Sequence, residues 1–453
     1  MHQLRRLRQL RAPWRALPRT RLQPDRGGAA IASIAATAKA ATDTSERRAG
    51  RVRPGQADYL LLVATVMLLI LGLLAVYTAS FAVAYNDFGD ANFFVKRQVV
   101  FAVVGLCALV FFMQMDYQRL RQLSVPMLLI ALVLLLLVLT PVGVGHNGAR
   151  RWLDFGPIEF QPSEFAKLAI IVYISAWLSS RGSDITKFSL GFVPFVILLG
   201  VIGALIISEP DMGTTIIIVL VACTLFFVAG APISHLALLL AVGALMSTAI
   251  ILTRDYQVAR FSSFLSAEAD PQGNGFQVLQ LLIALGSGGP FGLGWAESRQ
   301  KHLYVPGSQT DGVFAILGEE LGFIGLLFIL AIFAFFIYRG LRVTLRSRDS
   351  FALLLGIGIV SWIGYQTIIN IAGITRTIPL TGVPLPFLSY GGSALVMVMA
   401  AIGILLSISR YSSETSYVER ESESRERFRG TAQQSEKKRK RRRAGPAFDR
   451  ELA

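Results

Sequence analysis

The sequence predicts an all-α integral membrane protein that crosses the bilayer about ten times. Of its 453 residues 53% are hydrophobic and 16% are charged, and the mean hydropathy is +0.55. Soluble domains carry about 25% charged residues, so this composition excludes the soluble classes. Cys107 and Cys223 both lie in apolar runs, where they behave as small hydrophobic residues, and no disulfide framework is indicated.

Ten apolar stretches are long enough to cross a hydrocarbon core of about 30 Å as helices. They run near 59–81, 98–115, 122–141, 165–180, 190–207, 212–230, 233–253, 313–338, 351–372 and 391–409, with a large extracytoplasmic loop between the seventh and the eighth. The stretches are continuous rather than alternating, and lipid offers no water to unpaired backbone groups. Helices are therefore expected, and barrel strands are not.

Lysine and arginine are distributed unevenly along the chain. With both termini in the cytoplasm, 34 of the 44 lie on the inner side and ten on the outer side, as the positive-inside rule requires. This distribution explains the formal net charge of +15 without a nucleic acid partner. Residues 1–58 and 410–453 are expected to be disordered basic cytoplasmic tails around a membrane domain at 59–409.

The informative polar residues collect in three long segments on the outer side, at 142–164, 254–312 and 373–390, whereas the inner loops are short. Chemistry is therefore expected on the outer face. In the first segment a helix start at Pro162 places Glu164 and Lys167 on one face of its first turn. The two residues either form a simple helix-end ion pair or, together with Arg150 and Arg151, hold an anionic group such as pyrophosphate at the bilayer surface.

Carboxylates also stand at the ends of later spans. Glu209 follows the fifth span, where it needs water, a cation or a cavity, and Asp211 can cap the sixth. Asp311 at the outer mouth of the eighth span is either a helix cap or a base for a sugar hydroxyl, because partial desolvation raises basicity. Glu319 and Glu320 lie two turns deeper and are expected to be structural or to line a cavity.

The remaining outer segments predict local structure of different kinds. The apolar stretch 276–285 is too short to span and predicts an interfacial or re-entrant helix with Gln277 and Gln280 on one face. The glycine-rich run 286–294 follows no strand and precedes no Gly-Lys-Ser/Thr, so a nucleotide site is not expected. Prolines and glycines in 379–393 predict a rigid loop towards the cavity, either a structural plug or a substrate contact.

Four motifs in this order resemble the FtsW/RodA (SEDS) family over about residues 57–410. They are Arg-Arg-Trp-Leu at 150–153 with Gln-Pro-Ser-Glu-Phe-Ala-Lys at 161–167, Glu-Pro-Asp at 209–211, Gln-Thr-Asp at 309–311 before Gly-Glu-Glu-Leu-Gly at 318–322, and Pro-Leu-Pro-Phe-Leu-Ser-Tyr-Gly-Gly-Ser at 384–393. The long basic tails favour an FtsW-like division member.

The resemblance implies an activity and partners. Members of this family are peptidoglycan glycosyltransferases that polymerise lipid II, an undecaprenyl-pyrophosphate-linked disaccharide peptide, on the outer face of the bacterial cytoplasmic membrane during division or elongation. They work beside a class B penicillin-binding protein that cross-links the product, and with other membrane proteins of the divisome or elongasome.

The resemblance also implies site residues. Asp311 matches the catalytic aspartate, and it would deprotonate the 4-hydroxyl of one lipid-linked sugar as that oxygen attacks the anomeric carbon of another. Lys167, held by Glu164, would offset the pyrophosphate charge. Substrate contacts are expected at Arg151, Trp152, Gln161, Glu209, Gln277, Lys301, Ser389 and Tyr390. No cofactor or metal cluster is evident, although a divalent cation (Mg²⁺ or Mn²⁺) could assist the departure of pyrophosphate.

The chain departs from the family pattern at two places. Many members have His-Thr-Asp-Phe where this chain has Gln-Thr-Asp-Gly at 309–312, so no imidazole stands next to Asp311. Arg376 stands where an apolar residue is expected, and it either binds pyrophosphate or faces solvent.

Two other functions fit a polar cavity among membrane helices. A flippase for a lipid-linked precursor needs comparable access from both sides, which the short inner loops disfavour. A scaffold that only positions a partner enzyme predicts that loss of the Asp311 carboxylate leaves activity unchanged.

Overall fold

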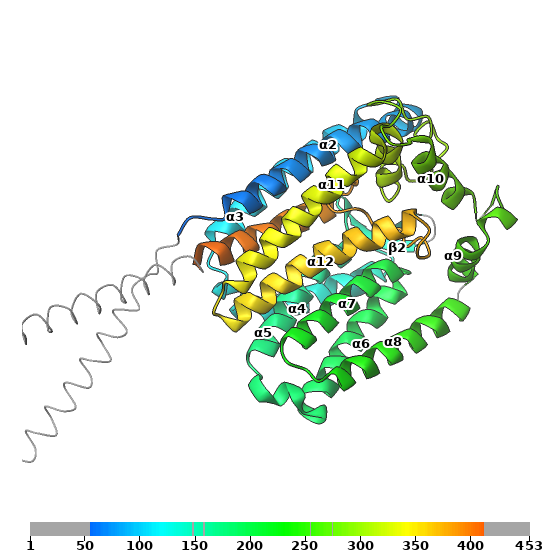
Figure 1. Ribbon diagram of the computed structural model, residues 1–453. Coiled ribbons are helices and arrows are strands. Elements are labelled where there is room, and N and C mark those ends of the chain that lie inside the picture. Colours follow the sequence, from blue (N-terminus) through cyan, green and yellow to red (C-terminus); the bar gives the residue numbers. More distant parts are fainter. Residues whose placement is uncertain (1–54, 147–148, 157–158, 254, 274, 412–453) are drawn as a thin grey trace, which may run out of the picture. The chain divides into compact units, whose positions relative to one another are not determined.

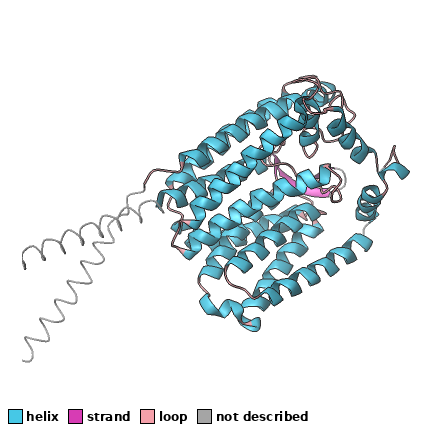
Figure 2. Cartoon of the chain, viewed as in Figure 1, coloured by secondary structure: helices cyan, strands magenta, loops and turns pink. Residues whose placement is uncertain are grey.

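The computed structural model describes residues 55–411, apart from 147–148, 157–158, 254 and 274. Helices dominate this part of the chain, and each of the ten predicted spans coincides with one (Figures 1 and 2). They are α2 (Tyr59–Phe88), α3 (Phe93–Gln114), α4 (Gln118–Val138), α5 (Pro162–Ser179), α6 (Val193–Ser208), α7 (Met212–Val228), α8 (Ile233–Thr253), α11 (Val313–Leu345), α12 (Ser350–Ile374) and the last helix, Gly392–Tyr411. The predicted all-α, multi-pass membrane fold is confirmed.

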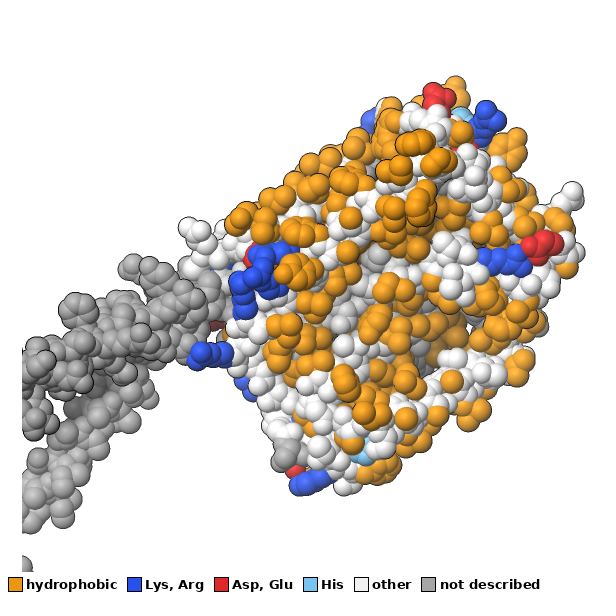
Figure 3. All heavy atoms as spheres, in the orientation of Figure 1, with side chains coloured by type: hydrophobic (Ala, Val, Ile, Leu, Met, Phe, Trp, Pro, Cys, Tyr) orange, Lys and Arg blue, Asp and Glu red, His pale blue; other side chains and the backbone are white. Residues whose placement is uncertain are grey.

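The helices differ in how much of their surface the protein itself covers. Eight have both the length and the apolar composition of a membrane span, with α6 counted together with the turn before it as Phe188–Ser208, while α7 is shorter and α5 carries two buried charges. The central helices α5, α12 and Gly392–Tyr411 are mostly buried, whereas α8 buries only Leu239. Apolar side chains cover much of the visible face in Figure 3. A helix that is apolar all round and exposed in the fold faces lipid.

Both ends of the described chain are attached to the bundle. Asp58 caps α2 by accepting a hydrogen bond from the Leu61 amide, and it forms an ion pair with Arg339 of α11. Arg410 donates to the backbone oxygens of Gly55 and Met113. The predicted tails, 1–58 and 410–453, otherwise lie outside the described residues.

A small antiparallel sheet follows α4, where the sequence predicts only a polar outer segment. Its strands are β1 (Gly143–His146), β2 (Ala149–Asp154) and β3 (Glu159–Phe160), in the order β1-β2-β3. Strands this short carry too little alternation to be recognised in a sequence. Leu153 of β2 is buried, which anchors the strand and fixes where the neighbouring Arg151 and Trp152 lie.

The long segment before α11 contains two helices. The predicted short helix is present as α10 (Phe276–Ser287), and its twelve residues are too few to span a bilayer. A second helix, α9 (Asp255–Leu265), followed by the single turn η3 (Ala267–Ala269), was not predicted.

The helix α11 is broken at Gly322, which corrects the prediction of a continuous eighth span. Gly322 has φ 68° and ψ −172°, and a Cβ there would lie 2.2 Å from the Gly292 amide nitrogen, so no other residue fits. The glycine-rich run satisfies the backbone groups that the break leaves open. The four hydrogen bonds run from Leu293 N to Glu319 O (2.9 Å), Gly294 N to Glu320 O (3.1 Å), Phe323 N to Gly289 O (2.9 Å) and Ile324 N to Pro290 O (3.1 Å).

Candidate functional site

A cavity of about 840 Å³ lies at the end of the bundle that carries the sheet. Its polar wall comes from α3, the sheet, α5, α7, α9 and the segments before α11 and after α12. The ionisable residues on it are Arg97, Arg151, Glu159, Glu164, Lys167, Asp211, Arg260, Asp311 and Tyr390. Phe88, Phe93, Phe94 and Phe101, from the end of α2 and from α3, form an aromatic part of the wall. The cavity therefore suits a ligand with a charged head and an apolar tail.

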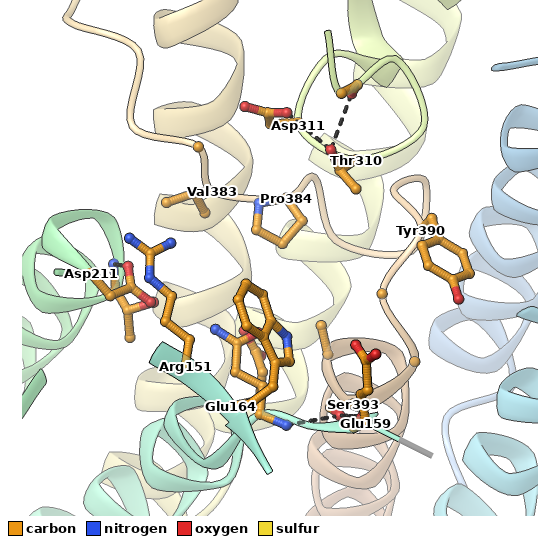
Figure 4. A pocket seen from close by; sticks show the side chains of 18 of the residues that line it. Arg151, Glu159, Glu164, Asp211, Thr310, Asp311, Val383, Pro384, Tyr390 and Ser393 are labelled. Carbon is orange, nitrogen blue, oxygen red and sulfur yellow. Dashed lines mark hydrogen bonds between the residues drawn. The ribbon is translucent and has the colours of Figure 1, made fainter. Parts of the chain in front are cut away.

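Asp311 is held on one side of this cavity by a tight turn (Figure 4). The Gly312 amide donates to the Gly307 carbonyl oxygen (3.0 Å), and the Thr310 hydroxyl donates to Asp311 Oδ1 (3.1 Å). Gly307 has φ 69°, and a Cβ there would lie 2.5 Å from Asp311 Oδ1. Asn370 of α12 donates to the Asp311 carbonyl oxygen (3.0 Å) and so connects the turn to the buried core. The backbone thus fixes the direction of the carboxylate.

The surroundings of Asp311 favour its protonated form. The side chain is half-buried, and desolvation raises the pKa of Asp311 above its ordinary value of 3.8. Hydrogen bonding from Thr310 and Gln277 and the positive charge of Arg260 act in the opposite direction. A carboxylate with a raised pKa is a stronger base once it is ionised.

Glu164 and Lys167 lie in the first two turns of α5, and Figure 4 shows Glu164 across the pocket from Asp311. The Lys167 ammonium donates to Glu164 Oε1 (2.8 Å) and to Gln366 Oε1 (3.0 Å), and it lies 5.1 Å from the centre of the Trp362 ring. Each side chain of the ion pair is 2% exposed. Gln366 also donates to the Pro384 carbonyl oxygen (2.9 Å), so this network joins α5 and α12 to the loop after α12. Lys167 is held in place on three sides, which makes it a fixed positive charge.

Arg151 reaches from β2 to the turn between α6 and α7. Its guanidinium donates to the backbone oxygens of Glu209 (3.1 Å) and Pro210. In Figure 4 it lies beside Asp211, whose carboxylate caps α7 by accepting from the Thr214 amide (3.0 Å). The capping role expected for Asp211 is thus present, and the residue also lines the cavity.

Seven of the predicted site residues meet at this cavity. They are Asp311, Glu164, Lys167, Arg151, Trp152, Gln161 and Tyr390. They come from four separate parts of the sequence, and the fold brings them together.

Four predicted substrate contacts lie elsewhere. Glu209 is fully buried and does not line the cavity; burial raises its pKa to about 8, and the hydrogen bond from Arg151 goes to its backbone oxygen. The Ser389 hydroxyl accepts from the Leu385 amide (2.8 Å) inside its own loop. Gln277 donates to the Pro306 carbonyl oxygen (3.2 Å) and lies next to Asp311 without lining the cavity.

Lys301 is the fourth of these residues, and it is buried in the outer loop. Its ammonium pairs with Glu320 Oε1 (3.0 Å), at the break in α11. Glu319 accepts hydrogen bonds from the Ser298 hydroxyl (2.5 Å) and the Arg299 amide (3.0 Å). Both glutamates therefore attach the loop to α11, which agrees with the structural alternative given for them.

The cavity wall also contains polar residues of α9 and α3 that were not predicted from the sequence. Gln257 and Arg260 of α9 both line the cavity, as does Arg97 of α3. Gln257 and Arg260 are three residues apart, a spacing that places two polar side chains on one helical face. That spacing was the available signal, but it is short and lies in a segment expected to be a loop.

Comparisons with known proteins agree with this arrangement. A family model described as cell cycle protein, of the FtsW, RodA and SpoVE type, matches residues 59–414. Stage V sporulation protein E of Bacillus subtilis is 44% identical over 356 residues, which cover 78% of this chain and 97% of the relative. A probable peptidoglycan glycosyltransferase FtsW of Geobacter sp. is 37% identical over 353 residues, covering 78% and 96%.

Two solved structures share the fold. One chain of a peptidoglycan synthase complex, described as coordinating polymerization and crosslinking, is 29% identical with a TM-score of 0.66, covering 79% of this chain and 98% of that chain. The rod shape determining protein RodA of Thermus thermophilus is 26% identical with a TM-score of 0.59, covering 78% and 97%. On the family match and these identities, the chain belongs to the FtsW/RodA/SpoVE family of cell cycle proteins.

Proposed function

We propose that this chain is a peptidoglycan glycosyltransferase that polymerises lipid II on the outer face of the bacterial cytoplasmic membrane. The relatives named as probable peptidoglycan glycosyltransferases and the structural relative from a peptidoglycan synthase complex support this activity. The observation that carries the proposal is the placement of Asp311, a half-buried carboxylate in a cavity with cationic and aromatic walls. A sugar linked through pyrophosphate to a prenyl chain matches these walls, because its pyrophosphate is anionic and its prenyl chain is apolar.

The geometry supports an inverting displacement. Asp311 takes the proton from the 4-hydroxyl of one lipid-linked sugar as that oxygen attacks the anomeric carbon of the other. The bond from the anomeric carbon to the pyrophosphate breaks, and the pyrophosphate leaves with the bonding electrons. Lys167 and Arg151 supply fixed positive potential across the cavity for the charge that develops on the leaving group.

The proposal assigns no step to a metal ion. The carboxylates of the described residues form no group of three or more side chains that could hold one, and Asp211 already uses its oxygens to cap α7. The dependence of polymerisation on Mg²⁺ or Mn²⁺ is measured by chelation and readdition in the assay below.

Partner and location follow from the same proposal. The structural relative belongs to a synthase complex, which supports a class B penicillin-binding protein as the partner of this chain, with other divisome or elongasome membrane proteins beside it. The distribution of lysine and arginine supports cytoplasmic termini, which places the cavity on the outer face of the cytoplasmic membrane.

The test is polymerisation of labelled lipid II by the full chain in proteoliposomes with its penicillin-binding partner. We expect Asp311→Asn to lower the initial rate by about 10²- to 10⁴-fold, the usual contribution of a general base, while the protein remains folded. The matched control is Asp90→Asn, which removes an exposed carboxylate on the same side that pairs with Lys96 outside the cavity. Full activity of Asp311→Asn would support the scaffold, and transport of lipid II without polymer would support the flippase.

A further inference from the structure

The helix α9 carries Arg260 into the cavity, yet it has little support from the bundle. Among the described residues it packs broadly only against α8 and η3, its neighbours in the sequence. Figure 1 shows α8 and α9 at the margin of the helices, and α8 itself is almost entirely exposed. The position of Arg260 therefore depends on a few specific contacts.

Arg376, which follows α12, makes several of these contacts. Its Nε donates to the Phe264 carbonyl oxygen (2.9 Å) and its Nη2 to the Leu265 carbonyl oxygen (3.1 Å). These carbonyls belong to the last turn of α9, where four oxygens have no partner inside the helix and where a positive charge is favourable. The guanidinium also pairs with both carboxylate oxygens of Glu268 in η3. Arg376 thus caps a helix distant in the sequence.

The backbone at Arg376 is in an unusual conformation. Its φ is 54°, in the left-handed region that costs a residue other than glycine about 1 kcal/mol or more. The turn that ends α12 holds this conformation: the Arg376 amide donates to the Gly373 carbonyl oxygen (3.2 Å) and the Thr377 amide to the Ala372 carbonyl oxygen (2.8 Å), the paired bonds of a helix C-terminal cap. The turn therefore fixes the backbone from which the Arg376 side chain reaches α9 and η3.

The other end of the arrangement lies at Asp311. Arg260 donates through Nη1 to the Leu380 carbonyl oxygen (3.0 Å), in the same segment that Arg376 begins. A methyl group built on Gly382 would lie 3.4 Å from Arg260 Nη2 and 3.8 Å from Asp311 Oδ2. The guanidinium and the carboxylate therefore face each other across a residue with no side chain.

We propose that Arg376 is a positioning residue for the catalytic base: by capping α9 and pairing with η3, it fixes Arg260 beside Asp311. The proposal rests on the function proposed above for Asp311. It answers the open alternative for Arg376, because the side chain is directed to α9 and lies outside the cavity wall.

The arrangement predicts how the pH dependence of the reaction changes. The charge of Arg260 lowers the pKa of Asp311, against the effect of burial. The other groups next to this carboxylate are Gln277 of α10 and Thr310, which are not charged. The other charged groups on the cavity wall come from α5, α7, the sheet and α3, and Tyr390 is the remaining titratable group; the charged residues are Glu164, Lys167, Asp211, Arg151, Glu159 and Arg97. If α9 shifts and Arg260 moves away, Asp311 takes up its proton more readily, so a higher pH is needed to ionise it.

The experiment measures the initial rate of polymerisation against pH at saturating lipid II, with the full chain and its partner in proteoliposomes. Arg376→Asn removes the guanidinium and keeps a residue that tolerates the left-handed backbone. We expect the ascending limb of the profile to move to higher pH by about 0.5 unit or more, and the rate below the limb to fall about threefold. Arg376→Lys should restore part of the shift. Lys96→Asn, which breaks an exposed ion pair outside the cavity, is the matched control.

A double-mutant cycle separates positioning from general damage. If Arg376 acts through Arg260, the ascending limb of the pH profile lies at no higher pH in the double variant Arg260→Gln/Arg376→Asn than in Arg260→Gln alone. The proposal is overturned if the ascending limb of Arg376→Asn lies at the same pH as that of wild type. It is also overturned if this variant loses the same fraction of its rate at every pH. Asp311→Asn is assayed in parallel. If it is inactive while Arg376→Asn behaves like wild type, the inference fails and the proposed function stands, whereas an active Asp311→Asn removes both.

Discussion

The buried ion pair between Glu164 and Lys167 gives the sharpest prediction about stability. The two side chains are 2.8 Å apart and 2% exposed, and Glu164 Oε2 has no hydrogen-bond partner among the described residues. Lys167→Met keeps most of the volume of the side chain but leaves the carboxylate without its positive charge. Removing one partner of such a buried pair costs about 3–5 kcal/mol. We expect the free energy of unfolding to fall by that amount.

The converse change is expected to cost less. In Glu164→Gln the Lys167 ammonium keeps the Gln366 oxygen at 3.0 Å and the Trp362 ring at 5.1 Å. In the double variant Lys167→Met/Glu164→Gln no buried charge remains, so most of the lost stability should return, although polymerisation should not. The cycle then gives a coupling energy of about 2–3 kcal/mol.

The measurement is unfolding in mixed micelles, followed by tryptophan fluorescence across a titration with denaturing detergent. Both single variants, the double variant and wild type are compared in the same micelles. A Lys167→Met variant as stable as wild type would contradict the stabilising role of this ion pair, and so would a larger loss of stability in Glu164→Gln than in Lys167→Met.

Three further predictions concern the base, the outer loop and the loop after α12. Because the pKa of Asp311 is raised in the folded state, ionisation of this side chain destabilises the fold at pH values above that pKa. The melting temperature of Asp311→Asn at pH 8 should therefore equal or exceed that of wild type, and the difference should vanish in acid. Thermal unfolding at several pH values measures this difference. Lys301→Met leaves Glu320 without its ion-pair partner, so it should lower the free energy of unfolding by about 3 kcal/mol. The double variant Lys301→Met/Glu320→Gln should regain that stability. Equal stability of the two variants would contradict a stabilising role of this ion pair. Gly72→Ala places a Cβ 2.1 Å from the Phe387 carbonyl oxygen, so it should lower the free energy of unfolding by about 1–3 kcal/mol and reduce polymerisation. Wild-type stability and wild-type polymerisation in this variant would contradict the close contact of α2 with the loop after α12.

Much of the fold could be predicted because each bilayer span needs a long apolar run. Composition and run length alone placed all ten helices near their observed positions. The sheet and α9 were not predicted, because their segments are short and their conformation is determined by contacts with residues distant in the sequence. The break in α11 was not predicted for a different reason. Gly322 alone does not signal a break, which depends on the close approach of Gly292.

Those residues of the candidate site that carry a charge and stand at the end of an apolar helix could be predicted from the sequence. Asp311, Glu164 and Lys167 were found because charged groups at the ends of apolar helices are costly without a purpose. Lys301 was misplaced because its charge lies in an outer loop, and only the fold shows that Glu320 turns to meet it. Arg376 was left with two alternatives, since the carbonyls that it caps belong to a helix that the sequence did not reveal.

The break at Gly322 lies within the apolar section of α11 rather than at its edge. Arg339 pairs with Asp58 at the start of α2, which marks one end of this apolar section. At 1.5 Å per residue, residues 323–338 are about 24 Å long, short of a hydrocarbon core of about 30 Å, so the turns at 313–321 are needed to complete the crossing. Asp311 comes just ahead of these turns, at the end of the crossing. On the proposed function, a polyprenyl-linked sugar would therefore meet Asp311 while its tail is still dissolved in the bilayer.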